Sequence, residues 1–108
     1  GGERDKGKRK MMGTVAEKFA DIVFITDDNP RNEDPASIRN EIATYCKKSI
    51  NVDGRKKAIS KAIGIMKKND ILLIAGKGHE KTQEIKGKVS LFDDEIVAKE
   101  YFDKRFSL

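Results

Sequence analysis

Apolar side chains recur along this chain at two spacings, which predict helices and strands in alternation. In four segments the apolar positions fall three or four residues apart, the spacing of an amphipathic helix. These segments are residues 10–20, 35–46, 54–66 and 94–102. Two continuous apolar runs, residues 22–25 and 71–75, are typical of strands that are covered on both faces of a parallel sheet. A shorter pair of strands is predicted at residues 82–85 and 88–92, joined around Gly87.

The order of these elements predicts an α/β domain with three layers. Right-handed crossovers turn such an alternation into a mostly parallel sheet with helices on both faces. Ligands of these sheets collect at the carboxyl ends of the strands. The loops at residues 26–31 and 76–80 follow the two apolar runs, so we expect them on one rim. The loop at residues 1–9 would join that rim if a further strand precedes it.

Length and composition limit what this chain can be. Its 108 residues, 37% of them hydrophobic, predict a single domain, residues 1–108, with one modest core. No apolar run approaches the roughly 18 residues that a membrane span requires, so no membrane partner is expected. One cysteine excludes a disulfide within the chain, and one cysteine with one histidine cannot build a zinc site alone. We therefore expect no metal site and a reducing, cytoplasmic location.

The net charge of +5 raises nucleic acid as a partner. Residues 1–10 hold five basic and two acidic groups, and residues 47–68 hold eight basic and one acidic group. A nucleic-acid or nucleotide-binding module would use both segments on a shared face and would bind less tightly as salt rises. Aromatic side chains are few and none clusters near this charge, which disfavours base stacking. We keep this module as the alternative and expect no nucleic-acid partner.

The first loop resembles a phosphate-binding loop only in part. Residues 2–8 match the first seven positions of the G-x-x-x-x-G-K pattern, but Arg9 stands where a Ser or Thr must bind magnesium. A basic loop before a helix still favours anions, because the helix dipole and the free N–H groups add to its charge. The alternative is a basic loop that is simply solvated.

The other two loops offer side chains of opposite charge to a ligand. Residues 27–31, Asp-Asp-Asn-Pro-Arg, form either a capping turn or a binding loop, and the planar fork of Arg31 suits a carboxylate or phosphate. In residues 76–80 the glycines allow close approach of a ligand, and Glu80 can accept a hydrogen bond from an ammonium group. His79 and Cys46 have no catalytic partners in the sequence, so we expect both to be structural.

Taken together, four segments resemble the C-terminal domain of the Mur ligases, most closely the MurE type. They are residues 1–9 (GGERDKGKR), 26–31 (TDDNPR), 54–55 (GR) and 75–80 (AGKGHE). The resemblance implies a dinucleotide-binding-like fold. It also implies an ATP-dependent ligase of peptidoglycan precursor synthesis, and hence of cell wall biogenesis, cell shape and cell division. Such ligases have three domains, which bind the UDP-sugar, ATP and the incoming amino acid.

The reaction that the resemblance implies adds meso-diaminopimelate to UDP-N-acetylmuramoyl-L-alanyl-D-glutamate through an acyl phosphate. It assigns the amino acid to Arg4, Asp28, Asn29, Pro30, Arg31, Gly76 and Glu80. Asn29 and Arg31 would grip the distal carboxylate, while the Gly76 carbonyl and the Glu80 carboxylate would hold the distal ammonium. Lysine lacks that carboxylate, so Arg31 argues for diaminopimelate or a close analogue such as lanthionine. Asp5 and Lys8 would lie near the phosphates of ATP.

The resemblance also implies what this chain lacks. The phosphate-binding loop, the magnesium ligands and the modified lysine of the family belong to the central domain. We therefore expect no catalytic residue here, with ATP and Mg²⁺ bound by the full-length enzyme and not by this chain alone. Glu3 stands where aspartate is common in the family. The chain is expected to be an inactive fragment of the C-terminal domain, with its first strand missing upstream.

Overall fold

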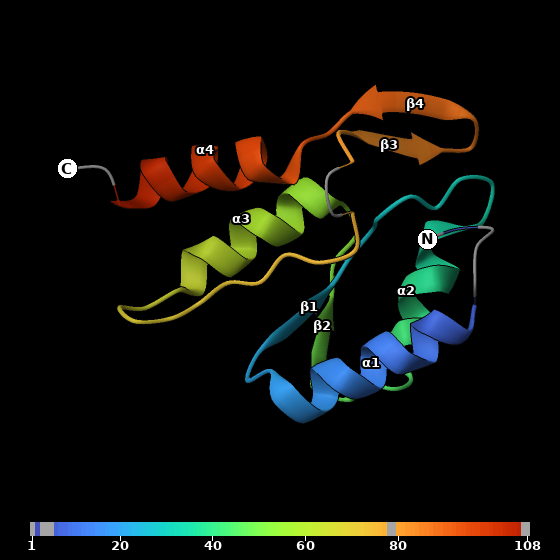
Figure 1. Cartoon of the computed structure of the whole chain (residues 1–108), viewed down its shortest axis with the longest axis horizontal. Helices are drawn as coiled ribbons and strands as arrows, with labels where there is room; N and C mark the ends of the chain where they lie inside the picture. Colours follow the sequence, from blue (N-terminus) through green and yellow to red (C-terminus); the bar gives the residue numbers. More distant parts are fainter. Residues whose placement is uncertain (1, 3–5, 78–79, 107–108) are drawn as a thin grey trace.

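The computed structural model describes residues 2, 6–77 and 80–106 (Figure 1). The helices are α1 (Gly7–Phe19), α2 (Pro35–Ala43), α3 (Arg55–Ile65) and α4 (Asp94–Phe106). The strands are β1 (Val23–Ile25), β2 (Ser49–Asn51), β3 (Thr82–Ile85) and β4 (Lys88–Leu91). Among the described helices, none has the length and apolar character needed to cross a membrane.

The strands form two small sheets, and the larger architecture is α/β as predicted. β1 and β2 run parallel, with Val23 opposite Ser49 and Ile25 opposite Asn51. Parallel neighbours need a crossover connection, and α2 supplies it. The helices lie on both sides of this strand pair, with α1 and α2 on one side and α3 and α4 on the other (Figure 1). β3 and β4 form the predicted antiparallel hairpin.

The hydrophobic core lies between β1, α2 and α3. Its buried apolar side chains are Ile25, Ile38, Cys46, Val52, Ala58, Ile59, Ala62 and Ile63. The last four belong to α3 and confirm the helical spacing that predicted its buried face. β2 was not predicted, because its residues, Ser-Ile-Asn, carry no apolar run and its side chains are mostly exposed.

The apolar stripe predicted for the first helix is not buried. Met11 is 60% exposed and Phe19 is 74% exposed, whereas Arg9 and Gly13 are the buried residues of α1. The reason is that α1 packs on α2 through its smallest residue: a Cβ on Gly13 would lie 2.7 Å from the Ile42 carbonyl oxygen. The helix is therefore where the spacing predicts it, but a different face makes the contact.

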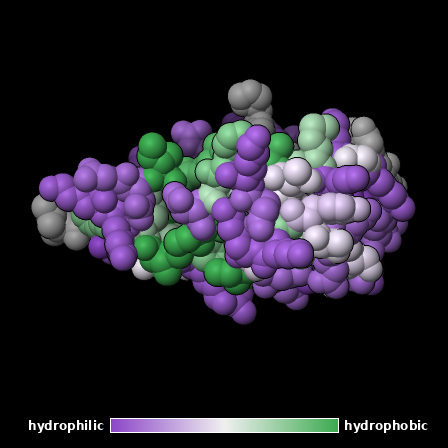
Figure 2. Space-filling model, turned by 90° about the horizontal axis from the view of Figure 1, so that it is seen from below, coloured by the Kyte–Doolittle hydropathy of each residue, from purple (hydrophilic) through white to green (hydrophobic). Residues whose placement is uncertain are grey.

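Residues 71–75, predicted as a strand covered on both faces, form an extended segment that pairs with none of the described strands. Leu72 and Ile74 are half-buried, while Ile71 is 94% exposed and Leu73 is 84% exposed. Side chains of an extended chain alternate in direction. Leu72 and Ile74 face α3 and α4, whereas Ile71 and Leu73 are exposed. Figure 2 shows hydrophobic residues gathered on the face of the molecule that is seen from below.

Two glycines within helices give opposite predictions for replacement by alanine. Gly13→Ala should destabilise the fold by about 1–3 kcal/mol, because the added methyl meets the backbone of Ile42. Gly64→Ala should stabilise it by about 0.5–1 kcal/mol, because a Cβ there has no neighbour within 4 Å and alanine favours the helix. Urea unfolding of the two variants measures both effects. Equal shifts of one sign would contradict the packing of α1 on α2.

Candidate functional site

Two loops that are far apart in the sequence meet at the carboxyl end of β1. The amide Nδ2 of Asn29 donates a hydrogen bond of 2.6 Å to Oε2 of Glu80. A Cβ on Gly76 would lie 3.7 Å from the carboxylate carbon of Asp28. The structure therefore brings Asp28, Asn29, Gly76 and Glu80 together on one rim.

The start of the chain reaches the same rim. The backbone N–H of Gly2 donates to the Asn29 carbonyl at 2.6 Å, and a Cβ on Gly2 would lie 1.7 Å from the Pro30 carbonyl oxygen. Only a glycine permits so close an approach. Pro30 is fully buried beneath this contact. Arg4 and Asp5, the other predicted site residues of this loop, lie outside the described residues.

Arg31 is held in an unusual backbone conformation beside these groups. Its φ is +55°, in the left-handed region that non-glycine residues rarely adopt. Its backbone N–H donates to the Glu84 carbonyl at 2.9 Å, and its own carbonyl accepts from the N–H of Lys86. Nη1 of its guanidinium donates to the carbonyls of Gly2 at 2.8 Å and Asn29 at 3.2 Å. The hairpin and the first loop thus fix where this guanidinium lies.

The hairpin also orients the side chain of Asn29, which is 5% exposed. The backbone N–H of Glu84 donates to Oδ1 of Asn29 at 2.8 Å, and Nε2 of Gln83 donates to the Asp28 carbonyl at 2.8 Å. Because Oδ1 is an acceptor, Nδ2 must face Glu80 as a donor. The exposed carboxylate of Glu80 is therefore fixed in direction. Gln83 and Glu84 were missed as site residues, since strand alternation alone did not show which loop β3 would join.

Arg55, which is 4% exposed, lies beneath both loops. Its Nη1 donates to the Asp27 carbonyl at 3.2 Å and its Nη2 donates to the Ala75 carbonyl at 3.1 Å. Asp94, in the first turn of α4, binds Nε at 2.7 Å and Nη2 at 2.6 Å. A planar guanidinium with five N–H donors can bond to all of these acceptors at once. The sequence marked Arg55 through the Gly54-Arg55 pair but assigned it no role.

Two charged residues of the candidate loops are used within the fold. The Asp27 carboxylate accepts from Nη1 of Arg39 at 2.5 Å and from the N–H of Gly54 at 2.9 Å. Lys77 is 2% exposed, and its ammonium donates to the Thr82 carbonyl and lies 5.9 Å from the ring centre of Phe92. Both groups therefore bond within the fold and support the two loops.

The phosphate-loop resemblance does not extend to Arg9. Arg9 is buried between two carboxylates, with Nη2 2.9 Å from Glu33 and Nη1 2.6 Å from Glu41. The hydrogen bond to Glu33 raises the pKa of Arg9, against the lowering effect of burial. Lys8, in the first turn of α1, is exposed and can meet an anion. Within the described ranges no group of three or more His, Cys, Asp or Glu side chains is placed to hold a metal ion.

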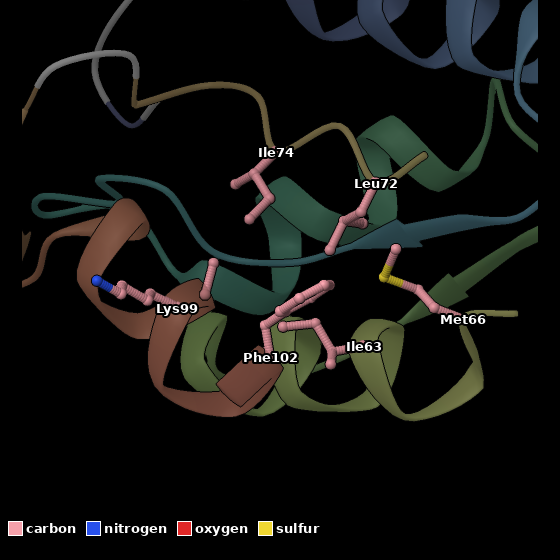
Figure 3. A pocket seen from close by; sticks show the side chains of 7 residues that line it. Ile63, Met66, Leu72, Ile74, Lys99 and Phe102 are labelled. Atoms are coloured by element: carbon pink, nitrogen blue, oxygen red, sulfur yellow. The ribbon is translucent and has the colours of Figure 1, made fainter. Parts of the chain in front are cut away.

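An apolar pocket lies apart from this rim, between α3, α4 and residues 71–75 (Figure 3). Its volume is about 290 Å³, and it is lined by Ile63, Met66, Leu72, Ile74, Ala98, Phe102 and the stem of Lys99. The side chains in Figure 3 converge without a hydrogen-bonding group among them other than the Lys99 ammonium, which lies at the edge. The pocket is a packing feature of the α3–α4 layer, and we assign it no ligand.

The helical parts of the two basic segments lie on different faces, while Lys48 of the second segment donates to the Ala20 carbonyl directly after α1. α1, which carries Lys8 and Lys10, lies on the opposite side of β1 and β2 from α3 (Figure 1). A nucleic-acid module would need both segments on one surface. This arrangement separates the basic residues of α1 from those of α3.

Comparisons with known proteins show which family this chain matches. The family described as "Mur ligase, glutamate ligase domain" matches residues 1–78. Two UDP-N-acetylmuramoyl-L-alanyl-D-glutamate–2,6-diaminopimelate ligases are similar to this chain. The one from Anaplasma marginale is 52% identical over 95 residues, and the one from Zymomonas mobilis is 53% identical over 104 residues. These alignments cover 87% and 93% of this chain but 20% and 21% of the relatives. The chain thus spans about a fifth of the length of the relatives that it matches.

A solved structure of a UDP-N-acetylmuramoyl-L-alanyl-D-glutamate–2,6-diaminopimelate ligase superposes on the whole chain. The TM-score is 0.90 at 36% sequence identity, and the match covers 100% of this chain and 23% of that one. The α/β arrangement described above is therefore shared with that ligase over every element.

Replacing Asn29 tests the contact between the two loops. Asn29→Asp should destabilise the chain by about 1–3 kcal/mol, because a carboxylate would replace the donor that faces Glu80. Adding Glu80→Gln should recover most of this loss, since the new amide can donate to the new carboxylate. A double-mutant cycle by urea unfolding measures the coupling. Two additive effects would mean that the contact does not form.

Cys46 should behave as a protected thiol. Burial raises the pKa of the Cys46 thiol, and its hydrogen bond to the Glu17 carboxylate adds to the effect. Alkylation by iodoacetamide at pH 8 should be about a hundredfold slower in the folded chain than in urea. The protonated thiol contributes stability that is complete below the unfolded pKa of about 8.5 and is lost as pH rises through the higher folded value. Equal alkylation rates would place this thiol at the surface.

Proposed function

This chain belongs to the Mur ligase family, and from that premise we propose that it is the amino-acid-binding part of an ATP-dependent ligase. The ligase adds meso-diaminopimelate to UDP-N-acetylmuramoyl-L-alanyl-D-glutamate in peptidoglycan precursor synthesis. The observation that carries this proposal is the rim on which Arg31 lies beside the joined side chains of Asn29 and Glu80. That rim offers a cationic fork and an anionic acceptor a short distance apart, as an amino acid with charged groups at its far end requires.

The proposed recognition divides the distal end of diaminopimelate between the two loops. Asn29 and Arg31, with Asp28 and Pro30 shaping their loop, bind the distal carboxylate. The Gly76 carbonyl and the Glu80 carboxylate bind the distal ammonium. Gly76 suits this role because its φ is +108°, a backbone conformation that other residues rarely adopt. Arg4 is proposed to contact the same amino acid and lies outside the described residues.

The amine at the other end of the amino acid is the nucleophile of the proposed reaction. A D-glutamyl carboxylate oxygen first attacks the γ-phosphorus of ATP, so that an acyl phosphate forms and ADP leaves. The neutral amine then attacks the acyl carbon, phosphate leaves with the bonding electrons, and the nitrogen loses a proton as the amide bond forms. The contribution of this chain is to hold the amine in place, which converts an encounter of two molecules into a reaction within one complex.

The described residues suit this binding role. Within them, no cluster of carboxylates, histidines or cysteines is placed for a metal. We propose that magnesium and the main ATP cradle belong to other parts of the longer protein, with Lys8 and Asp5 approaching the phosphates. The proposed setting is the cytoplasm. The 108-residue chain alone is expected to bind the amino acid and to form no amide bond.

Arg31→Ala tests the proposed substrate. Loss of the charged hydrogen bonds should weaken diaminopimelate binding, measured by calorimetry at fixed salt, by about 2–3 kcal/mol, roughly 30- to 150-fold. Binding of lysine, which lacks the distal carboxylate, should change by less than about twofold. Lys61→Ala, which removes an exposed charge from α3, is the matched control and should leave both affinities unchanged. Equal affinity of Arg31→Ala and the parent chain for diaminopimelate would refute the role of Arg31.

A further inference from the structure

We infer that Arg55 and Asp94 form a positioning pair that sets the separation between the two halves of the amino-acid site. This inference rests on the proposed function and goes beyond it, because neither side chain is among the residues proposed to touch the amino acid. The pair lies below the rim, where α3 and α4 begin.

The partners of Arg55 are the residues at which the two loops start. The Asp27 carbonyl directly precedes Asp28, and the Ala75 carbonyl directly precedes Gly76. One guanidinium therefore holds the base of both loops through bonds of 3.2 and 3.1 Å. A rigid planar group with acceptors on two edges fixes the distance between those acceptors.

Asp94 makes this bridge possible. A buried guanidinium without a counterion is strongly unfavourable, and the bidentate contact of Asp94 at 2.7 and 2.6 Å both neutralises it and fixes its plane. Asp94 itself lies in the first turn of α4, where the helix dipole favours a negative charge. The position of α4 is thereby linked to the geometry of the site, although α4 provides no ligand group.

The two loops are thus joined at two levels. The bond from Asn29 to Glu80 joins them at the rim, and Arg55 joins them at the base. Between these levels lies Gly76, and a Cβ there would be 3.9 Å from Nη1 of Arg55. Gly76 has no side chain to pack against its neighbours. The hydrogen bond from Arg55 to the Ala75 carbonyl therefore determines where the Gly76 carbonyl lies.

This arrangement predicts a difference between substrates. Diaminopimelate would bind both loops at once, with its distal carboxylate on one and its distal ammonium on the other. Lysine would bind the ammonium side alone. Loosening the base of the loops should therefore weaken the use of diaminopimelate more than the use of lysine, whereas a general loss of folding would lower both equally.

The experiment measures kcat/KM for diaminopimelate and for lysine in the full-length ligase that carries this chain. Arg55→Lys retains the charge but cannot reach both carbonyls and Asp94 together. The ratio of the two kcat/KM values should fall at least about tenfold, the effect of one charge-assisted hydrogen bond. Arg9→Lys is the matched control, because Arg9 is equally buried and is ion-paired with Glu33 and Glu41. Its ratio should stay at the value of the parent enzyme.

A second variant covers failure of the first to fold. Asp94→Glu retains the charge and displaces the carboxylate by one methylene, so it should lower the same ratio. The positioning role is overturned if the variant that folds has lower activity with both substrates but an unchanged ratio. The proposed function fails separately: a parent enzyme that does not use diaminopimelate refutes it, whatever the Arg55 variants do.

Discussion

Buried guanidinium groups fix the carboxyl end of β1, and the candidate site is built on that end. Arg39 holds the Asp27 carboxylate and reaches Asn51 at the end of β2, so it joins the two parallel strands. Arg55 holds the Asp27 carbonyl from the opposite side. Each charge is neutralised by a carboxylate, as a buried arginine requires. Asp27 is therefore the residue through which both helical layers act on the loop that follows it.

This constraint explains why a short motif can act as a rigid one. With its start held at Asp27, the loop is fixed along its length by Pro30, which is fully buried, and by the hairpin bonds to Arg31. Preorganised binding groups lose less entropy when a ligand binds. The left-handed φ of Arg31 has a cost, and the bonds to Glu84 and Lys86 offset it.

Much of the apolar surface of the described residues lies on α1 and on residues 71–75. Met11 and Phe19 of α1 and the outward side chains of residues 71–75 are exposed because no described element packs against them. The helices that do pack together, α1 with α2 and α3 with α4, use other faces. Stability in the described fold therefore depends strongly on α3, on buried ion pairs and on close backbone contacts such as that of Gly13.

Local periodicity determined the existence of all four helices, the β1 strand and the hairpin, because those patterns depend on neighbours in the sequence. Turn chemistry likewise identified the loops that carry Asn29 and Glu80. Sequence could not show which face of α1 is buried, nor that β2 pairs with β1, because both depend on groups brought close only by folding. The same holds for Arg55, Gln83 and Glu84. Their roles arise from hydrogen bonds with backbone carbonyls and N–H groups, which almost every residue has. Only the tertiary structure decided which of these groups each residue contacts.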